Sequence, residues 1–117
     1  MRYVDGFLIA VPKKNLAAYK KMAQWGKRTW LKYGALDYVE SVGDDVNTHC
    51  GTPFSKVLKL KSGEVPVFAY IVYKSRAHRD QVNAKVMKDP SMEKFGPKMP
   101  FDPKRMSYAG FKVFVEA

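Results

Sequence analysis

The chain has 117 residues, of which 46% are hydrophobic and 27% are charged, the composition of a globular protein with one core. We therefore expect a single domain over residues 1–117. No apolar run approaches the roughly 18 residues of a membrane span, and the first residues lack a secretory pattern, so we expect no membrane association. Cys50 is the only cysteine, which excludes an intrachain disulfide and favours a soluble cytoplasmic protein.

The formal net charge is +10, from 21 lysines and arginines against 11 acidic residues. Such an excess favours anionic partners, among them nucleic acids and acidic small molecules. A solvated basic surface without any such partner produces the same net charge. The charge alone therefore leaves nucleic-acid binding open and does not determine the fold.

The first two predicted elements are a strand and a helix. Residues 3–11 are rich in β-branched and aromatic residues and are followed by Pro12, which predicts a strand. Both faces of this strand are apolar except at Asp5, a pattern typical of a central strand covered on both sides. Asn15 and Gly34 predict the two ends of a helix whose apolar residues recur every three or four positions.

Gly26 lies on the apolar stripe of this helix. Because glycine is unfavourable inside a helix, we expect the helix to approach the sheet closely there. The remaining elements follow from the same kinds of pattern. They are a strand over residues 35–46, a polar loop over 47–53, a hairpin of strands 54–60 and 65–73, a helix from Ser75 to about residue 88, a helical turn and ordered loop over 91–103, and a strand over 108–115.

This order of elements, β-α-β-(β)-β-α-β, predicts a ferredoxin-like α+β sandwich, an antiparallel sheet with two main helices on one face. The place of the additional strand, residues 54–60, stays open. Phe7, Ile9 and Val11 make the other face of the sheet apolar as well, and no helix remains to cover it. We therefore expect a homodimer in which two sheets face each other and the helices point outward.

Motifs of the well-known catalytic classes do not occur in the sequence. It contains no Gly-x-Ser-x-Gly and no glycine-rich phosphate loop. His49 and Cys50 are adjacent, but no second pair of Cys or His residues completes a set of four ligands, so we expect no metal site. We expect no cofactor either.

Polar residues that interrupt apolar strands are the candidate binding residues: Asp5, Glu40, Arg105 and Tyr108. The first and last strands of a ferredoxin-like sheet are neighbours, so Asp5 could meet Arg105 or Tyr108. One interpretation is a structural ion pair or hydrogen bond, since a buried carboxylate is costly unless it is paired. The other is a pocket in which Asp5 or Glu40 accepts a proton and Arg105 holds an anionic group.

A proline-rich segment precedes the last strand. Residues 96–103 contain three prolines interleaved with Met99 and Phe101. Prolines reduce the entropy lost when a loop is held in one shape, and methionine packs adaptably. This segment is therefore either a fixed strap that seals the core or dimer, or a lid over a pocket in which Met99 and Phe101 contact the ligand.

The first predicted helix also carries a basic face. Lys21, Trp25 and Arg28 lie one turn apart, and no acidic residue occurs between residues 13 and 32. Basic residues beside an exposed aromatic ring are what binding to single-stranded RNA requires. A solvated helix face with Trp25 at its packing edge explains the same pattern without a ligand.

Four segments of the sequence resemble the YbaA-like family of small bacterial proteins: residues 3–7 (YVDGF), 34–36 (GAL), 89–92 (DPSM) and 99–111. Shorter matches run over residues 11–12, 39–40, 44–46 and 79–80. The resemblance implies the dimeric α/β-barrel architecture that small cofactor-free monooxygenases share. It implies no activity, because that family has none established.

The function therefore stays unknown at the level of the sequence, and whether the protein is an enzyme stays open. The leading expectation is a dimeric α/β-barrel protein that binds a small organic molecule, with anionic molecules among the candidates. By fold analogy alone, a cofactor-independent oxygenase-like or isomerase-like enzyme fits this class. The alternatives are a basic, RNA-binding protein and a non-catalytic structural or stress-related dimer.

Overall fold

The computed structural model describes residues 1–95 and 99–117. The strands are β1 (Tyr3–Pro12), β2 (Asp37–Val42), β3 (Glu64–Tyr73) and β4 (Ser107–Lys112). The α-helices are α1 (Leu16–Lys32), α2 (Phe54–Val57) and α3 (Arg76–Met87). Short 3-10 helices cover Lys13–Asn15, Pro90–Phe95 and Pro103–Arg105.

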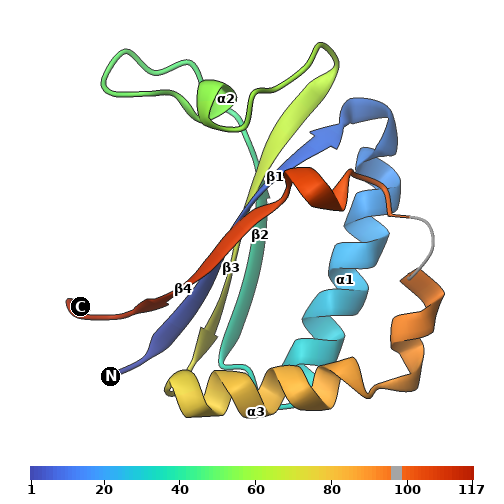
Figure 1. Cartoon of the computed structure of the whole chain (residues 1–117), viewed down its shortest axis with the longest axis vertical. Coiled ribbons are helices and arrows are strands. Elements are labelled where there is room, and N and C mark those ends of the chain that lie inside the picture. The colour runs from blue at the N-terminus through green and yellow to red at the C-terminus, as the bar shows by residue number, and fades with distance from the viewer. Residues whose placement is uncertain (96–98) are drawn as a thin grey trace.

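The four strands form one antiparallel sheet in the order β2-β3-β1-β4. The long helices α1 and α3 lie on the same side of this sheet (Figure 1). Two β-α-β units with a central pair formed by the first and third strands are the ferredoxin-like arrangement. The predicted fold is therefore confirmed. Over the described residues, no helix is long and apolar enough to cross a membrane.

The ends of both long helices have local causes. The Ser75 hydroxyl accepts a hydrogen bond from the His78 N–H at 3.1 Å, which caps the start of α3. Gly34 follows α1 with a φ of 111°, a left-handed conformation that glycine adopts without strain. Asn15 precedes α1 but does not cap it; its side-chain amide donates instead to the Pro100 carbonyl at 3.1 Å.

The prediction of a hairpin between strands 54–60 and 65–73 is wrong. Phe54–Val57 forms the short helix α2, and Lys59 has a φ of 51°, which is incompatible with an extended strand. The strand β3 pairs instead with β1 and β2. The second strand is also shorter than the predicted residues 35–46, since β2 covers only Asp37–Val42.

The two faces of β1 are the reverse of what the sequence suggested. Ile9 and Val11 are buried in a cluster with Tyr19 of α1, so these residues and Phe7 face the helices. Because side chains alternate along a strand, Val4 and Leu8 belong to the other face. The register places Leu8 opposite Phe68 and Val4 opposite Phe111. This helix-free side, hereafter the open face, is therefore apolar, but through different residues.

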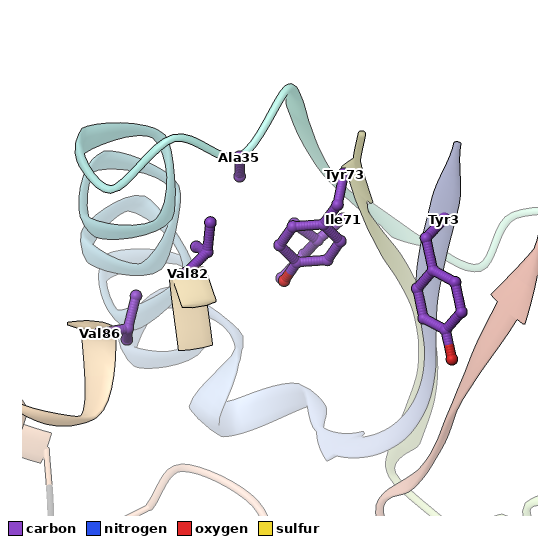
Figure 2. Close-up of a cluster of buried hydrophobic side chains, with 6 residues drawn as sticks. All are labelled: Tyr3, Ala35, Ile71, Tyr73, Val82 and Val86. Carbon is purple, nitrogen blue, oxygen red and sulfur yellow. The ribbon is translucent and has the colours of Figure 1, made fainter. Parts of the chain in front are cut away.

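Two buried clusters fill the space between the sheet and the helices. In one cluster, Ile71 and Tyr73 of β3 point toward Val82 and Val86 of α3 (Figure 2). The other cluster contains Ile9, Val11, Tyr19, Val67 and Phe101. Phe7 is only partly buried and packs against both clusters. The space between the clusters is therefore not closed, and it holds the candidate site.

Candidate functional site

A cavity of about 580 Å³ lies between the helix-covered face of the sheet and α1. The sheet contributes alternate residues of each strand, because positions two apart share a face. These are Asp5, Phe7 and Ile9 of β1, Tyr38 and Glu40 of β2, Ala69 and Ile71 of β3, and Tyr108 of β4. All four strands of the sheet therefore contribute side chains to one wall of the cavity.

The opposite wall belongs to α1 and carries both tryptophans of the chain, Trp25 and Trp30. Their rings meet edge to face, with centroids 6.0 Å apart. The segment between Met99 and Met106 also lines the cavity. The walls are therefore mostly aromatic and aliphatic, as in sites that bind small organic molecules.

Glu40 is the most distinctive polar group in the cavity. Its Oε1 atom accepts a hydrogen bond from the Tyr19 hydroxyl, and its Oε2 atom accepts one from the Tyr38 hydroxyl at 2.7 Å. Burial, and then the proximity of Glu40, raises the pKa of both tyrosines well above the usual value. Both phenols therefore stay protonated at neutral pH and act as donors, which leaves Glu40 as the acceptor.

Asp5 has a different environment, because it is paired with a cation. The carboxylate is only 2% exposed and lies 3.1 Å from Nη1 of Arg79, which comes from α3. Burial raises the pKa of Asp5, and Arg79 opposes that change. The Arg79 guanidinium also lies over the ring of Tyr3, 5.0 Å from its centroid. Arg79 also pairs with the exposed Asp80 at 2.9 Å, so Asp5 is a cation-paired part of the wall that shares its cation.

Three of the four candidate residues from the sequence line the same cavity: Asp5, Glu40 and Tyr108. Tyr108 stacks on Phe7 with ring centroids 5.4 Å apart, next to the position of Asp5 on β1. Arg105 does not line the cavity and does not meet Asp5. Its Nη2 atom donates to Glu64 at 2.8 Å and to the Lys59 carbonyl at 3.0 Å. Of the two partners considered for Asp5, Arg105 pairs with Glu64 instead and Tyr108 lines the same cavity, while the cation beside Asp5 is Arg79.

The two residues proposed as a lid have unequal environments. Phe101 is buried in the cluster around Tyr19, and the two rings meet edge to face with centroids 5.8 Å apart. Met99 lines the same cavity but remains exposed. Phe101 thus forms part of the packed core, whereas Met99 lies at the rim. Residues 96–98 of the proline-rich segment lie outside the described residues.

Trp25 does not form an exposed platform on the basic helix face. Its indole N–H donates to the Ser91 hydroxyl at 2.7 Å, and its ring lines the cavity beside Trp30. Lys21 and Arg28 remain exposed on α1. The interpretation of Lys21, Trp25 and Arg28 as an RNA contact therefore loses the aromatic ring on which base stacking depends.

Several residues of the cavity were not identified from the sequence. They include Tyr19, Tyr38 and Trp30, and four methionines: Met22, Met87, Met92 and Met106. One signal was available, since Tyr38 and Glu40 are two apart in a strand and so share a face. The methionines come from four separate segments, so only the tertiary fold brings them together. Within the described parts of the chain, no cluster of three His, Cys, Asp or Glu residues could hold a metal ion.

The topology and this cavity together define a ferredoxin-like protein with an apolar, carboxylate-bearing cavity between its sheet and its helices. The chain belongs to the DUF1428 family, described as a protein of unknown function, whose sequence model matches residues 2–103.

The sequence is similar over nearly its full length to proteins that share one name. It is 42% identical over 116 residues to the uncharacterised protein YbaA of Escherichia coli K12, with 99% of each chain covered. The Shigella flexneri protein of the same name is equally similar, at 42% identity over 116 residues. The resemblance to the YbaA-like family is thereby confirmed, and the family has no assigned activity.

Among solved structures, the chain is similar to the crystal structure of a dimeric ferredoxin-like protein from an uncultured marine organism. The TM-score is 0.59 at 14% sequence identity, and the similarity covers 100% of both chains. At that identity the likeness shows the fold alone.

Proposed function

We propose that this protein binds a small, largely apolar organic molecule in the cavity between its sheet and α1. The observation that carries the proposal is the cavity of about 580 Å³ itself, with its mostly apolar walls and two carboxylates. Ligand sites commonly measure roughly 300–1,000 Å³ and combine apolar walls with a few polar groups.

The size and lining of the cavity suit a small organic ligand, because sites of this volume usually combine apolar walls with a few polar groups. Five methionines line the space, and methionine is the side chain that adapts most readily to ligands of different shape. Glu40 supplies a hydrogen-bond acceptor at which a ligand can be oriented.

We further propose that the protein is a homodimer of the dimeric α/β-barrel type, located in the cytoplasm. The open face supports the dimer, because Phe68 and Phe111 remain 44% and 57% exposed on it. The similar marine protein is described as dimeric, which agrees with this assembly. The single cysteine, Cys50, is exposed and free, as in proteins of a reducing compartment.

Titration with N-phenyl-1-naphthylamine tests the binding proposal, because this uncharged dye fluoresces strongly only in apolar sites. We expect saturable enhancement with one dye molecule per chain. Ala23 lines the cavity, so Ala23→Trp should fill it and abolish the enhancement. Ala17 is exposed on the same helix, so Ala17→Trp is the matched control and should bind the dye normally.

Two results would contradict this proposal. The first is a wild-type protein that gives no saturable enhancement. The second is an Ala23→Trp protein that keeps both its fold, judged by circular dichroism, and its full dye binding. The second result would place the dye elsewhere, for example on the open face.

A further inference from the structure

We infer that the cavity selects organic cations, molecules with an apolar body and an ammonium group that binds at Glu40. This inference rests on the proposed function and names the class of its ligand.

The charge of the cavity is opposite to that of the chain. The sequence has 21 lysines and arginines against 11 acidic residues. The part of the cavity wall that the structure describes contains two carboxylates, Asp5 and Glu40, and neither lysine nor arginine. Residues drawn at random from this sequence would include more lysines and arginines than acidic residues. The described lining has the opposite balance, so its negative charge is a property of the site.

Among the described residues, Asp5 has a cationic partner and Glu40 has none. Asp5 is paired with Arg79 at 3.1 Å. Glu40 forms no ion pair with a lysine or arginine in residues 1–95 or 99–117, and its described side-chain partners are the neutral hydroxyls of Tyr19 and Tyr38. A half-buried carboxylate without a cation is electrostatically unfavourable, and a bound ammonium group would compensate it.

Glu40 retains the capacity to accept further hydrogen bonds. A carboxylate has about four lone-pair sites, and the two tyrosines occupy one on each oxygen. Tyr19 and Tyr38 come from α1 and β2, so they hold the carboxylate from both walls of the cavity. An ammonium group, which is a donor without an acceptor, is complementary to the lone pairs that remain.

The aromatic rings beside Glu40 favour the same class of ligand. Tyr38 and Trp30 have centroids 6.2 Å apart, and both line the cavity. Aromatic faces attract ammonium groups through their quadrupoles, and tryptophan does so most strongly. Arg105, the residue predicted to hold an anion, is occupied by Glu64. The geometry therefore favours a cation over the anionic ligand considered from the sequence.

Three compounds with one apolar body and different head groups test this inference: 4-tert-butylbenzylamine, 4-tert-butylbenzyl alcohol and 4-tert-butylbenzoate. Each competes with N-phenyl-1-naphthylamine at neutral pH and physiological salt. We expect the amine to displace the dye at a concentration at least about tenfold lower than the carboxylate, with the alcohol between them. The net charge of +10 favours the carboxylate, so a preference for the amine would have to come from the cavity.

Glu40→Gln should bring the three affinities to within about threefold of one another. Its binding of the uncharged dye shows whether the cavity is intact. Asp37→Asn removes one negative charge from an exposed position of the same strand and should leave the preference for the amine unchanged. If Glu40→Gln does not bind the dye, the test of the inference is the order in which the amine, the alcohol and the carboxylate displace the dye from the wild-type protein.

The possible failures are distinguishable. Equal displacement by all three compounds, or strongest displacement by the carboxylate, overturns the inference and leaves the proposed binding function intact. The same holds if Glu40→Gln binds the dye and keeps the full preference for the amine. Absence of dye binding by the wild-type protein overturns the proposed function and the inference with it.

Discussion

Gly26 lies in the middle of α1, where a glycine costs about 1 kcal/mol relative to alanine. The structure shows why a side chain is excluded at this position. A Cβ atom at Gly26 would collide with the Tyr38 hydroxyl, the group that donates to Glu40. The glycine therefore makes room for a hydrogen bond of the candidate site, as well as for close packing of helix and sheet.

We predict that Gly26→Ala lowers the free energy of unfolding by about 1–3 kcal/mol, because the strain of overpacking exceeds the gain in helix propensity. In a Tyr38→Phe background the same substitution should be much less harmful. The nearest remaining atom would then be Cζ of residue 38, at 3.2 Å from the added carbon. Urea denaturation of the four proteins in this double-mutant cycle measures the difference. Equal effects of Gly26→Ala in both backgrounds would refute the assigned contact.

Residue patterns predicted part of this site. The close approach at Gly26 followed from its place on the apolar stripe, and the structure confirms it. The partner of Asp5 did not follow, because Arg79 lies 74 positions away and comes from a helix, whereas the sequence argument considered only neighbouring strands. The periodicity of a helix does not indicate which of its polar side chains will form an ion pair with a strand residue.

At the scale of elements, one ion pair holds the segment that precedes β4. Arg105 closes the 3-10 helix Pro103–Arg105 and binds Glu64, the first residue of β3. It also donates to the Lys59 carbonyl, which follows α2. Arg105 thus joins three segments that are distant in sequence. Residues 54–60 have the composition of a strand but include the helical turn α2, and Arg105 holds the chain just after that turn.

This ion pair predicts a specific pH dependence of stability. Hydrogen bonding from Arg105 lowers the pKa of Glu64 from 4.5 to about 2. A carboxylate with a lowered pKa stabilises the fold above its unfolded-state value, and this contribution is lost as the pH falls toward the folded-state value. Glu64→Gln should therefore cost roughly 1–3 kcal/mol at pH 7, after allowance for solvent screening. The cost should vanish between about pH 4.5 and pH 2.

Chemical denaturation at a series of pH values measures this difference between the wild-type protein and Glu64→Gln. Glu93→Gln is the matched control, because Glu93 is exposed and forms no ion pair among the described residues. A difference between wild type and Glu64→Gln that stays constant down to pH 2 would show that the pair does not depend on the charge of Glu64.

At the scale of the whole molecule, the sheet has more apolar surface than its own helices cover. Both faces of β1 are apolar, and the prediction that the face of Phe7, Ile9 and Val11 is the uncovered one is wrong. The structure assigns Phe7, Ile9 and Val11 to the helices and the cavity. The alternation along the strands assigns Phe68 and Phe111 to the open face, with Val4 and Leu8 between them. Which face of β1 is covered depends on where the helices pack. The residue pattern of one strand does not contain that information.

We predict that the protein sediments as a dimer and that Phe68→Glu combined with Phe111→Glu gives a monomer, because two carboxylates cannot be buried without partners. Leu31→Glu is the control, since Leu31 is 42% exposed on α1 and away from the open face. It should leave the dimer intact.

The net charge of +10 on each chain opposes association, so the dimer should tighten as salt rises. Sedimentation equilibrium at low and at physiological ionic strength measures both effects. If the wild-type protein is a monomer at both, the open face does not pair with a second copy. If the double variant remains a dimer, the chains associate through another surface. In either case the cavity would still lie within one chain, so its ligand binding is testable independently of the assembly.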